Sequence, residues 1–460
     1  MDTKVHTSPR LFPNGKTHSF ASAIVVWEAC NVLAQRQSLP WQLDESGYLC
    51  HRRQVSGGRG EVTLCLTNTC TPDSPTVLKV EAAQAAIASW DIRSACLHLI
   101  YAAYATSLER PWEQTFTLSD QDISDYLGLG KRKDLSKLAK LTLIKDLVEQ
   151  PCKLLVTVDW SPQGRFRKIT IPQSHLWHLV NTQHHFQEDD LGCKHLTGLT
   201  FTVQAGQWAQ FFLNRQGSPE GATFYQYGTL PKSLLMHVMS LWQQHEGVAR
   251  IMLWLLFKAR MGSEQRITVQ TLMRIAYGEE RLLKASSHRE ERKRLMRSFE
   301  SDLEVLNRNH CKPIFDPSTY PLEIRPLWVK LADLPEDAEE ALEFWTNDGS
   351  QDNRLTDAAP RNKWHRLMHA RLLSFELPAD WAQQSPKSAK KSPKQRKQTH
   401  SKSSPSGQQI AAARKSLQLS QRVLADKLGK SQSWIRDIES GRLQLNEKDR
   451  GVLAELLCLG

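Results

Sequence analysis

Residues 407–460, GQQIAAARKSLQLSQRVLADKLGKSQSWIRDIESGRLQLNEKDRGVLAELLCLG, have the clearest helical pattern of the 460-residue chain. Their apolar residues recur at the spacing of helical faces, which predicts three short helices and a final helix over about residues 446–457. Gly429 can turn the chain between the second and third helices at little steric cost. The Ser431 hydroxyl can cap the third helix by accepting a hydrogen bond from a backbone N–H. The segment is long enough for one small helical domain.

The segment resembles the phage-repressor (Cro-type) helix-turn-helix family along its whole length. The matching residues are Leu419-Ser420-Gln421, Leu424-Ala425, Leu428-Gly429, Ser431, Ile435, Ile438-Glu439 and Gly441. The resemblance implies an all-α domain of five helices, in which a small alanine lets the second and third helices approach and the third helix lies in the DNA major groove. It implies double-stranded DNA as partner and favours a homodimer, because half-sites are usually paired.

The resemblance assigns roles to residues around this third helix. Gln432 can pair with adenine and Arg436 with guanine, while Lys430 and Arg442 flank the helix and are expected to bind phosphates. Gln421, at the start of the second helix, is expected to bind phosphate and to brace Gln432. The predicted DNA-binding residues are therefore Gln421, Lys430, Ser431, Gln432, Ser433, Arg436 and Arg442.

Two further features of the segment concern its packing. Arg414 and Glu439 match a pair that often forms an ion pair in the family, although a loose, solvated pair would contribute little. Trp434 stands where the family commonly has a small or polar residue. Its indole could pack against the domain or cover sugars and thymine methyl groups, so the base preference of this helix cannot be carried over from the family.

A basic, low-complexity segment precedes this domain. Residues 382–406 consist mainly of Ser, Pro, Lys and Gln, with seven bases and no acid. Such a composition cannot bury enough apolar surface to offset chain entropy, so we predict a disordered linker. It could be a solvated spacer or a nonspecific phosphate-binding arm.

Ahead of the linker, the sequence predicts a mainly α fold with small β-hairpins. Residues 1–80 form a mixed segment of short strands and turns, including a strand at 61–66. Between residues 81 and 225 the predicted order is a long helix, a short helix, a longer basic helix and a hairpin, at 81–108, 117–127, about 133–148, and 153–160 with 166–171.

The same order recurs between residues 226 and 381. An apolar helix at 248–258 precedes a short helix capped by Thr268, and Ser287-x-x-Glu290 predicts a capping box that opens the third helix. A strand-like run follows at 322–331. Helix, short helix, longer helix and hairpin is the winged-helix order, so we predict two such units, at 81–225 and 226–381.

The third helix of each predicted unit is basic. Laid in a major groove it could reach phosphates and base edges, whereas a charged helix face can equally be solvated and paired with neighbouring glutamates. The secondary candidates for DNA contact are Lys131, Arg132, Lys133, Arg289, Arg292 and Lys293. In element order alone, residues 81–335 resemble the iteron-binding replication initiators of bacterial plasmids, which would implicate replication machinery as a partner.

Composition excludes several classes of protein. The 60 Lys and Arg against 49 Asp and Glu give a net charge of +11, which favours a polyanionic partner such as nucleic acid. The longest apolar run, 251–257, is too short for the ~20 residues of a membrane helix, and the N-terminus has no secretory pattern. Nine cysteines without a CxxC pair predict reduced thiols, so we expect a bacterial, cytoplasmic, DNA-associated protein and no membrane partner.

No catalytic motif is found, so we expect no enzyme activity, cofactor or metal. Gly130-Lys131 resembles the end of a phosphate-binding loop, but Asp125 stands where its first glycine should be. His175 and His178 are three apart, which does not match the His-x-His metal site of rolling-circle nickases. Cysteines 50, 65 and 70 match no standard zinc spacing. The sequence therefore predicts a regulator of transcription or of plasmid replication, with a replication initiator as the alternative and a DNA-processing enzyme as a less favoured one.

Overall fold

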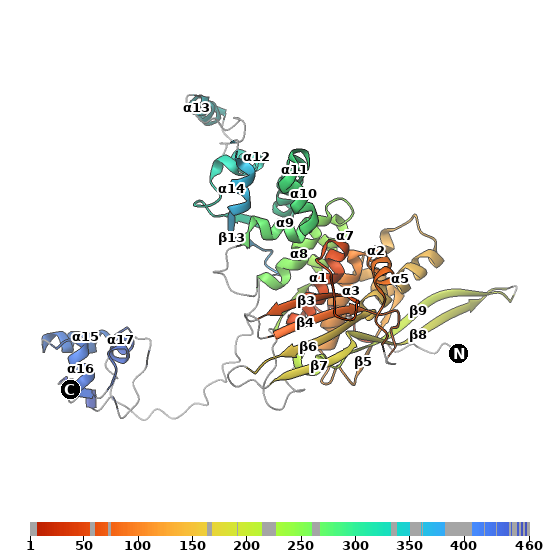
Figure 1. The fold of residues 1–460 in the computed structure, drawn as a ribbon, viewed down its shortest axis with the longest axis horizontal. Helices are drawn as coiled ribbons and strands as arrows, with labels where there is room; N and C mark the ends of the chain where they lie inside the picture. The colour runs from red at the N-terminus through yellow and green to blue at the C-terminus, as the bar shows by residue number, and fades with distance from the viewer. Residues whose placement is uncertain are drawn as a thin grey trace. The chain divides into compact units, whose positions relative to one another are not determined.

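A computed structural model describes most of the chain (Figure 1). The described residues are 7–55, 60–71, 75–162, 168–190, 192–213, 227–259, 267–332, 338–349, 360, 362–381, 407–417, 419–428 and 430–440, with single positions at 443, 449, 452–453 and 456–457. They form two compact units, which we call the body (Met1–Ser385) and the tail (Pro386–Gly460). The predicted linker, 382–406, lies outside the described residues.

Two buried helices form the centre of the body. Helix α1 (Ile24–Gln35) contacts α3 (Ile92–Thr106), and every residue of α3 from Ile92 to Ala105 is buried. The predicted long helix over 81–108 is wrong, because it is two helices, α2 (Val80–Ser89) and α3. The chain breaks between them where Asp91 leaves the helix and its carboxylate accepts a hydrogen bond from the Arg93 N–H, which caps α3.

A five-stranded antiparallel sheet packs beside these helices. Its strand order is β2-β3-β4-β6-β7, with bounds Gln42–Leu43, Leu49–Val55, Gly60–Leu66, Leu154–Trp160 and Ile169–His175. The predicted hairpin at 153–171 is confirmed as the antiparallel pair β6–β7. However, β6–β7 extends this sheet and is not the hairpin that completes the helical unit before it.

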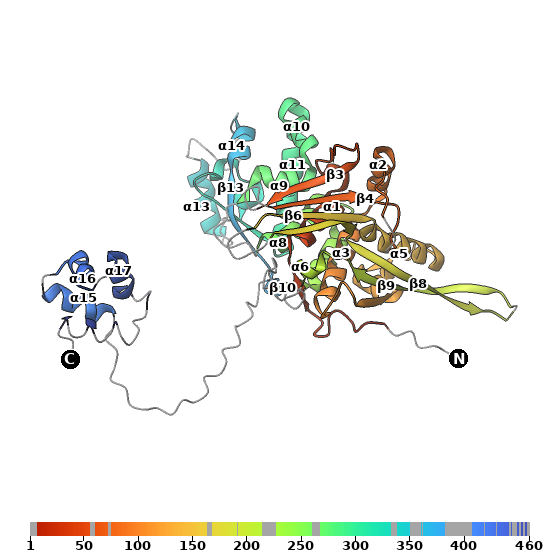
Figure 2. The same cartoon turned by 60° about the horizontal axis from the view of Figure 1, so that its bottom comes forward.

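The helical unit predicted for 81–225 is completed by the two strands that follow β7 in the chain. We call α3, β5 (Thr115–Ser119), α4 (Asp120–Tyr126), α5 (Lys137–Cys152), β8 (Trp177–Glu188) and β9 (Lys194–Ala205) the first module. Its sheet order is β5-β9-β8. The β8–β9 hairpin extends away from the rest of the body in both views (Figures 1 and 2).

A second set of elements repeats this topology. We call α8 (Glu246–Lys258), β11 (Ile267–Thr268), α9 (Val269–Tyr277), α11 (Arg289–Arg308), β12 (Lys312–Phe315) and β13 (Arg371–Glu376) the second module. Its sheet order is β11-β13-β12, so in both modules the last strand lies between the other two and all pairs are antiparallel.

The second module differs from its predicted details. Residues 322–331 are not a strand, because they form a 3-10 turn (Leu322–Ile324) and α12 (Leu327–Leu331), preceded by Pro321 and Pro326. The predicted Ser287 capping box is also wrong. Ser287 is the last residue of an additional helix, α10 (Glu279–Ser287), and its hydroxyl donates to backbone carbonyls of that helix. Two further helices, α13 (Ala338–Gly349) and α14 (Lys363–His369), separate β12 from β13.

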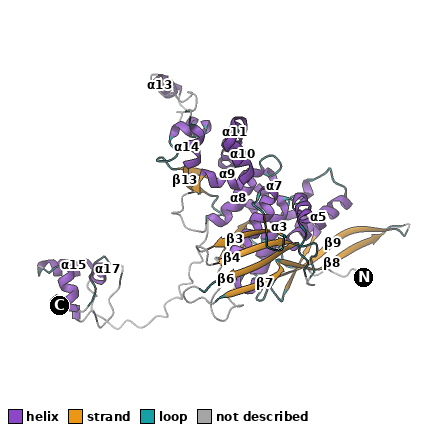
Figure 3. Ribbon diagram, viewed as in Figure 1, coloured by secondary structure: helices purple, strands orange, loops and turns teal. Residues whose placement is uncertain are grey.

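The described body is richer in strands than predicted. Figure 3 shows a group of strands beside a more helical region that contains β13, so the fold is a mixed helix and strand fold and the mainly α expectation is confirmed only in part. The smallest sheet pairs β1 (Thr17–Ala21) with β10 (Tyr227–Pro231), which precedes α7 (Lys232–Leu241). The short helix α6 (Ala209–Phe212) follows β9. One continuous hydrophobic core runs from Leu11 to Trp381 and includes residues of both modules.

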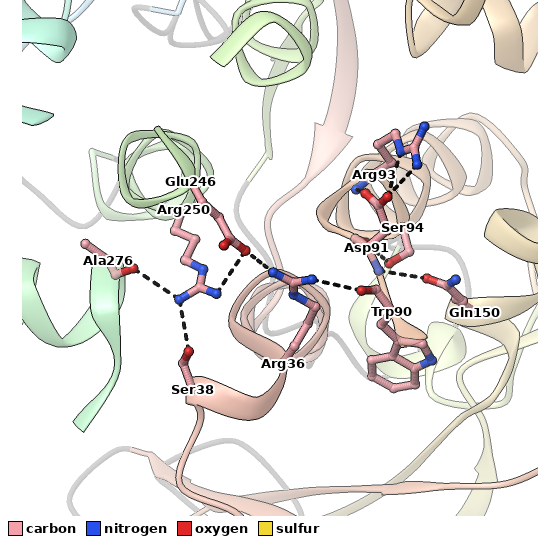
Figure 4. Close-up of polar contacts among 10 residues, drawn as sticks. All are labelled: Arg36, Ser38, Trp90, Asp91, Arg93, Ser94, Gln150, Glu246, Arg250 and Ala276. Carbon is pink, nitrogen blue, oxygen red and sulfur yellow. Dashed lines mark hydrogen bonds and ion pairs between the residues drawn. The ribbon is translucent and has the colours of Figure 1, made fainter. Parts of the chain in front are cut away.

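A polar network holds the end of α1 against both modules (Figure 4). Arg36 forms an ion pair with Glu246 of α8 and donates to the Trp90 carbonyl at 2.8 Å, just before α3. The buried Arg250 donates to Glu246 at 2.9 Å, and to Ser38 and the Ala276 carbonyl at 3.1 Å each. The network therefore connects α8, the first helix of the second module, to the end of α2 through residues 36–38.

Candidate nucleic-acid interface

Three helices and part of a further helix make up the described tail. They are α15 (Gly407–Ser416), α16 (Gln421–Leu428) and α17 (Gln432–Glu439). The Ser431 hydroxyl accepts a hydrogen bond from the Trp434 N–H at 3.2 Å, which caps α17 as predicted. The small core beneath the helices consists of Ile410, Leu424, Ala425, Ile435, Ile438, Leu453 and Leu457.

The outer face of α17 is open to solvent. Ile435 and Ile438 are buried, whereas Gln432, Ser433 and Arg436 are exposed. The side chain of Arg436 is 65% exposed, and its Nε lies 3.8 Å from a carboxylate oxygen of Asp437. An amide, a hydroxyl and a guanidinium on one exposed helical face provide the donors and acceptors that base edges in a major groove require.

Trp434 packs sideways against its own domain. It is half-buried against the tail core, and the Lys430 ammonium lies 5.1 Å from the centre of its ring. Lys430 also lies 3.2 Å from a carboxylate oxygen of Asp449. Lys430 would have to exchange this carboxylate for a phosphate in order to bind DNA, which costs little at an exposed site.

A buried carboxylate ties the three helices of the tail together. Glu439, at the end of α17, accepts hydrogen bonds from Arg414 of α15 at 2.6 and 3.1 Å. Arg414 also donates to the Leu419 carbonyl at 2.7 Å. Burial alone would raise the pKa of Glu439, but hydrogen bonds from Arg414 and Gln421 hold it below its ordinary value.

The contact that Gln421 makes is not the predicted one. Its amide donates to Glu439 at 2.8 Å instead of bracing Gln432, so it belongs to the buried cluster of Arg414 and Glu439. Gly429, Gly441 and Arg442 lie outside the described residues.

The first module places its basic candidates before the helix and not in it. Helix α5 begins at Lys137, where the Ser136 hydroxyl accepts from the Ala139 N–H at 3.2 Å, so Lys131, Arg132 and Lys133 lie in the preceding turn. Arg132 makes two hydrogen bonds to Asp134, at 2.7 and 2.6 Å.

Helix α5 carries three further lysines, of which Lys137 and Lys140 belong to the predicted basic helix and Lys145 was missed. Lys137, Lys140 and Lys145 lie on α5, and like Lys131 and Lys133 they form no ion pair with a described residue. Lys145 could have been found in the sequence as a further base within the predicted helix.

The second module uses its basic residues in internal contacts. Arg292 donates to the Ala285 and Ser286 carbonyls at 3.1 and 2.7 Å, which caps the end of α10, and its guanidinium lies 5.7 Å from the centre of the Trp364 ring. Lys293 pairs with Glu290 at 3.0 Å, and the neighbouring Arg294 pairs with Glu291 at 2.9 Å. Arg289 is exposed at the start of α11.

The described residues contain neither a metal-binding cluster nor a membrane-spanning helix. No group of three or more His, Cys, Asp and Glu side chains gathers there in a way that could hold a metal ion. No helix in this part of the chain has both the length and the apolar character needed to cross a membrane.

The comparison with protein families matches the tail. Residues 407–460 match a family model described as a helix-turn-helix domain, so the tail contains such a domain, which implies a DNA partner. No curated protein matches the chain.

Two solved structures show distant similarity. A selenomethionine crystal structure of domains 2 and 3 of RctB is 12% identical, with a TM-score of 0.29, and the match covers 54% of this chain and 77% of that one. A second crystal structure of RctB domains 2 and 3 has the same identity and TM-score and covers 60% of this chain and 83% of that one. Neither similarity is close enough to assign a function.

Proposed function

We propose that the protein binds double-stranded DNA in a sequence-specific manner and regulates transcription or plasmid replication. In this proposal, α17 of a Cro-type helix-turn-helix domain reads the major groove through Gln432, Ser433 and Arg436. Lys430, Ser431 and Arg442 hold the flanking phosphates, and Gln421, predicted to bind phosphate, instead supports α17 through Glu439. The protein acts by binding, without catalysis, a cofactor or a metal-dependent step.

The orientation of α17 carries this proposal. The helix buries Ile435 and Ile438 against α16 and α15, and this fixes its exposed side as the one with Gln432 and Arg436. The Arg414–Glu439–Gln421 cluster holds the far end of α17, so the reading face is supported at both ends. A preorganised helix loses little conformational entropy when it enters a groove.

The repeated topology of the body favours a second candidate function. Two modules with the same element order and the same sheet order support the proposal that the body contains tandem winged helices. Such a body could bind repeated origin sites and recruit replication machinery, which would make the protein a plasmid replication initiator. We place the protein in the bacterial cytoplasm, associated with DNA, as a homodimer on paired half-sites.

Selection of binding sites from random duplex DNA tests both candidates. We would compare the full chain with residues 1–385 and 407–460, which correspond to the two compact parts of the molecule. We expect residues 407–460 to select a defined sequence. Selection of direct repeats by residues 1–385 would support the initiator role, and selection of nothing would leave the body with a partner-binding or effector role. A tail that binds no duplex DNA would refute the proposal.

Substitutions on α17 test the assigned contacts. Gln432→Ala and Arg436→Ala should each relax base preference at one position, by about 1–3 kcal/mol of discrimination. Lys430→Ala should weaken binding to all DNA sequences alike and reduce the salt dependence of binding. Lys415→Ala, which removes an exposed charge from α15, is the matched control and should change neither. Equal losses of specificity in all four variants would contradict the assignment.

A further inference from the structure

Two cysteines lie directly opposite each other in the five-stranded sheet. Cys50 of β3 and Cys65 of β4 are register partners in the antiparallel pair of these strands, and both are free thiols. Partners in such a pair have Cα atoms about 4.5 or 5.5 Å apart, depending on whether they exchange hydrogen bonds. A disulfide joins residues whose Cα atoms are about 4.4–6.8 Å apart, so either spacing is suitable for one.

The two thiols belong to the same small apolar cluster. Cys50, Cys65 and Leu155 of β6 form a hydrophobic cluster separate from the main core of the body, and Val77 packs against it. Successive side chains of a strand point to opposite faces, so Cys65 lies on the face opposite to Leu64, which belongs to the main core. Cys50 is fully buried and Cys65 is 5% exposed.

The residue that covers this cluster is weakly anchored. Val77 pairs with Thr67 in an isolated β-bridge and not in a strand, and Val77 itself is only half-buried. The next residue, Leu78, donates its N–H to the Leu66 carbonyl at 2.8 Å. A segment held by so short a bridge opens locally more easily than a strand in a sheet, and such an opening would admit a small oxidant to the thiols.

A guanidinium lies beside the first of the two thiols. Arg52 follows Cys50 by two residues on the same face of β3, and a hydrogen bond with Cys50 raises the pKa of Arg52. A neighbouring cation stabilises the thiolate, which is the nucleophilic form of cysteine. Burial, and then the neighbouring Cys50, raise the pKa of Cys65 to about 12, so Cys65 keeps its proton at pH 7. Cys50 is therefore the thiol that reacts first.

We propose that Cys50 and Cys65 form a reversible disulfide when the protein meets hydrogen peroxide. The Cys50 thiolate attacks one peroxide oxygen and the O–O bond breaks, which gives a sulfenic acid on Cys50 and a hydroxide that takes up the proton lost by Cys50. The Cys65 sulfur then attacks the Cys50 sulfur, the S–O bond breaks, and the Cys65 proton leaves with the oxygen as water. Two thiols lose two electrons, and one peroxide becomes two water molecules.

The new bond would tie two neighbouring strands together. Residues 51–64 would lie inside the closed loop, so the disulfide would restrict separation of β3 from β4. A small thiol such as glutathione would reverse it by thiol–disulfide exchange. The site lies in the sheet of the body, and the proposal does not depend on DNA binding.

The test starts from the full chain with two substitutions. Cys193→Ser removes an exposed cysteine and Cys458→Ser removes one outside the described residues, which leaves seven of the nine cysteines. A small excess of hydrogen peroxide should lower the number of thiols titrated in the denatured protein from seven to five. Tryptic mapping without reduction should show one disulfide, between the peptides that contain Cys50 and Cys65, and dithiothreitol should remove it.

Three variants of this starting protein test the pairing and the order of the steps. Cys50→Ser and Cys65→Ser should each prevent the disulfide, and Cys70→Ser, the matched control at a half-buried cysteine, should leave it unchanged. In Cys65→Ser, dimedone should trap a sulfenic acid on Cys50, whereas in Cys50→Ser it should trap none on Cys65.

The peptide map of the starting protein decides the outcome even if the serine variants do not fold. A thiol count that stays at seven would overturn the proposal. So would a disulfide between Cys70 and Cys152, or a sulfinic acid on Cys50 without a bond to Cys65.

Discussion

The two modules of the body share one topology but differ in how they arrange charge. Helix α5 of the first module carries Lys137, Lys140 and Lys145 without an ion-pair partner among the described residues. Helix α11 of the second module pairs Lys293 and Arg294 with glutamates one turn before them. Two modules of the same topology can therefore differ in their attraction to DNA, because that attraction depends on the local net charge and not on the fold.

A buried ionisable group in each module has a shifted pKa, and the two shifts are opposite in direction. In the first module, burial lowers the pKa of His98 to about 4, so this ring is neutral in the folded state. In the second module, burial raises the pKa of Asp302, although hydrogen bonds from Tyr277 and His245 oppose the increase. As the pH decreases, His98 of the first module becomes protonated at a lower pH than a free histidine. Asp302 of the second module becomes protonated at a higher pH than a free aspartate.

Acid should therefore loosen the first module before the second. As the pH decreases from 6.5 to 4, the unfolded chain takes up a proton on His98 and the folded chain does not. The free energy of unfolding therefore decreases over this range, by at most about 3 kcal/mol. Asp302 has the opposite sign, because its raised pKa makes protonation favour the folded state as pH falls. Hydrogen exchange at pH 7 and pH 5, corrected for intrinsic rates, should show greater exposure of α3 than of α8. His98→Gln should reduce this difference, and greater exposure of α8 would contradict it.

Removing two lysines from α5 should weaken nonspecific DNA binding by the body. Lys137→Gln with Lys140→Gln should lower the affinity of residues 1–385 roughly tenfold at low salt and reduce the slope of log K against log salt by about two. The matched variant Lys293→Gln with Arg294→Gln should change the slope by less than one. Equal effects of the two variants would remove the distinction between the modules.

Arg292 should affect stability and not DNA affinity. Arg292→Ala removes two hydrogen bonds to the last carbonyls of α10 and the contact with Trp364, which should lower the free energy of unfolding by about 1 kcal/mol. Denaturant unfolding measures the loss. Arg289→Ala, on the exposed start of the same helix, is expected to leave stability unchanged.

Neutralising the paired acids should make the second module more like the first. Glu290→Gln with Glu291→Gln frees Lys293 and Arg294 and removes two negative charges, so nonspecific affinity of residues 1–385 should rise by about threefold. Salt titration with a fluorescent duplex measures the change. An unchanged affinity would indicate that α11 does not face DNA.

Local signals in the sequence predicted the tail well. The Ser431 cap, the α16 and α17 boundaries and the buried positions Ala425 and Ile435 all follow from neighbours within a few residues. Gln421 could not be placed, because its partner Glu439 is brought near by packing of three helices. The role of the tail was thus accessible from spacing, whereas its internal contacts were not.

The body was harder to predict because its pairings are distant. Helix α1 is buried on most of its surface, so it lacks the polar stripe that marks a helix. Strands β8 and β9 carry mainly exposed polar residues toward their shared turn, which weakens the alternation expected of strands. The partner of β12 lies beyond three helices, at residues 371–376, where no hairpin rule applies.

The network around Arg36 has a consequence for how the body could be placed on a duplex. Arg36 binds both Glu246 of α8 and the Trp90 carbonyl at the end of α2, and one hydrophobic core includes residues of both modules, so we expect the two modules to keep a fixed relative orientation. If both modules face DNA, the protein then fixes the spacing and the helical rotation between the two sites that they contact. A half-turn insertion of about five base pairs between two such sites should then cost more than a full-turn insertion of about ten.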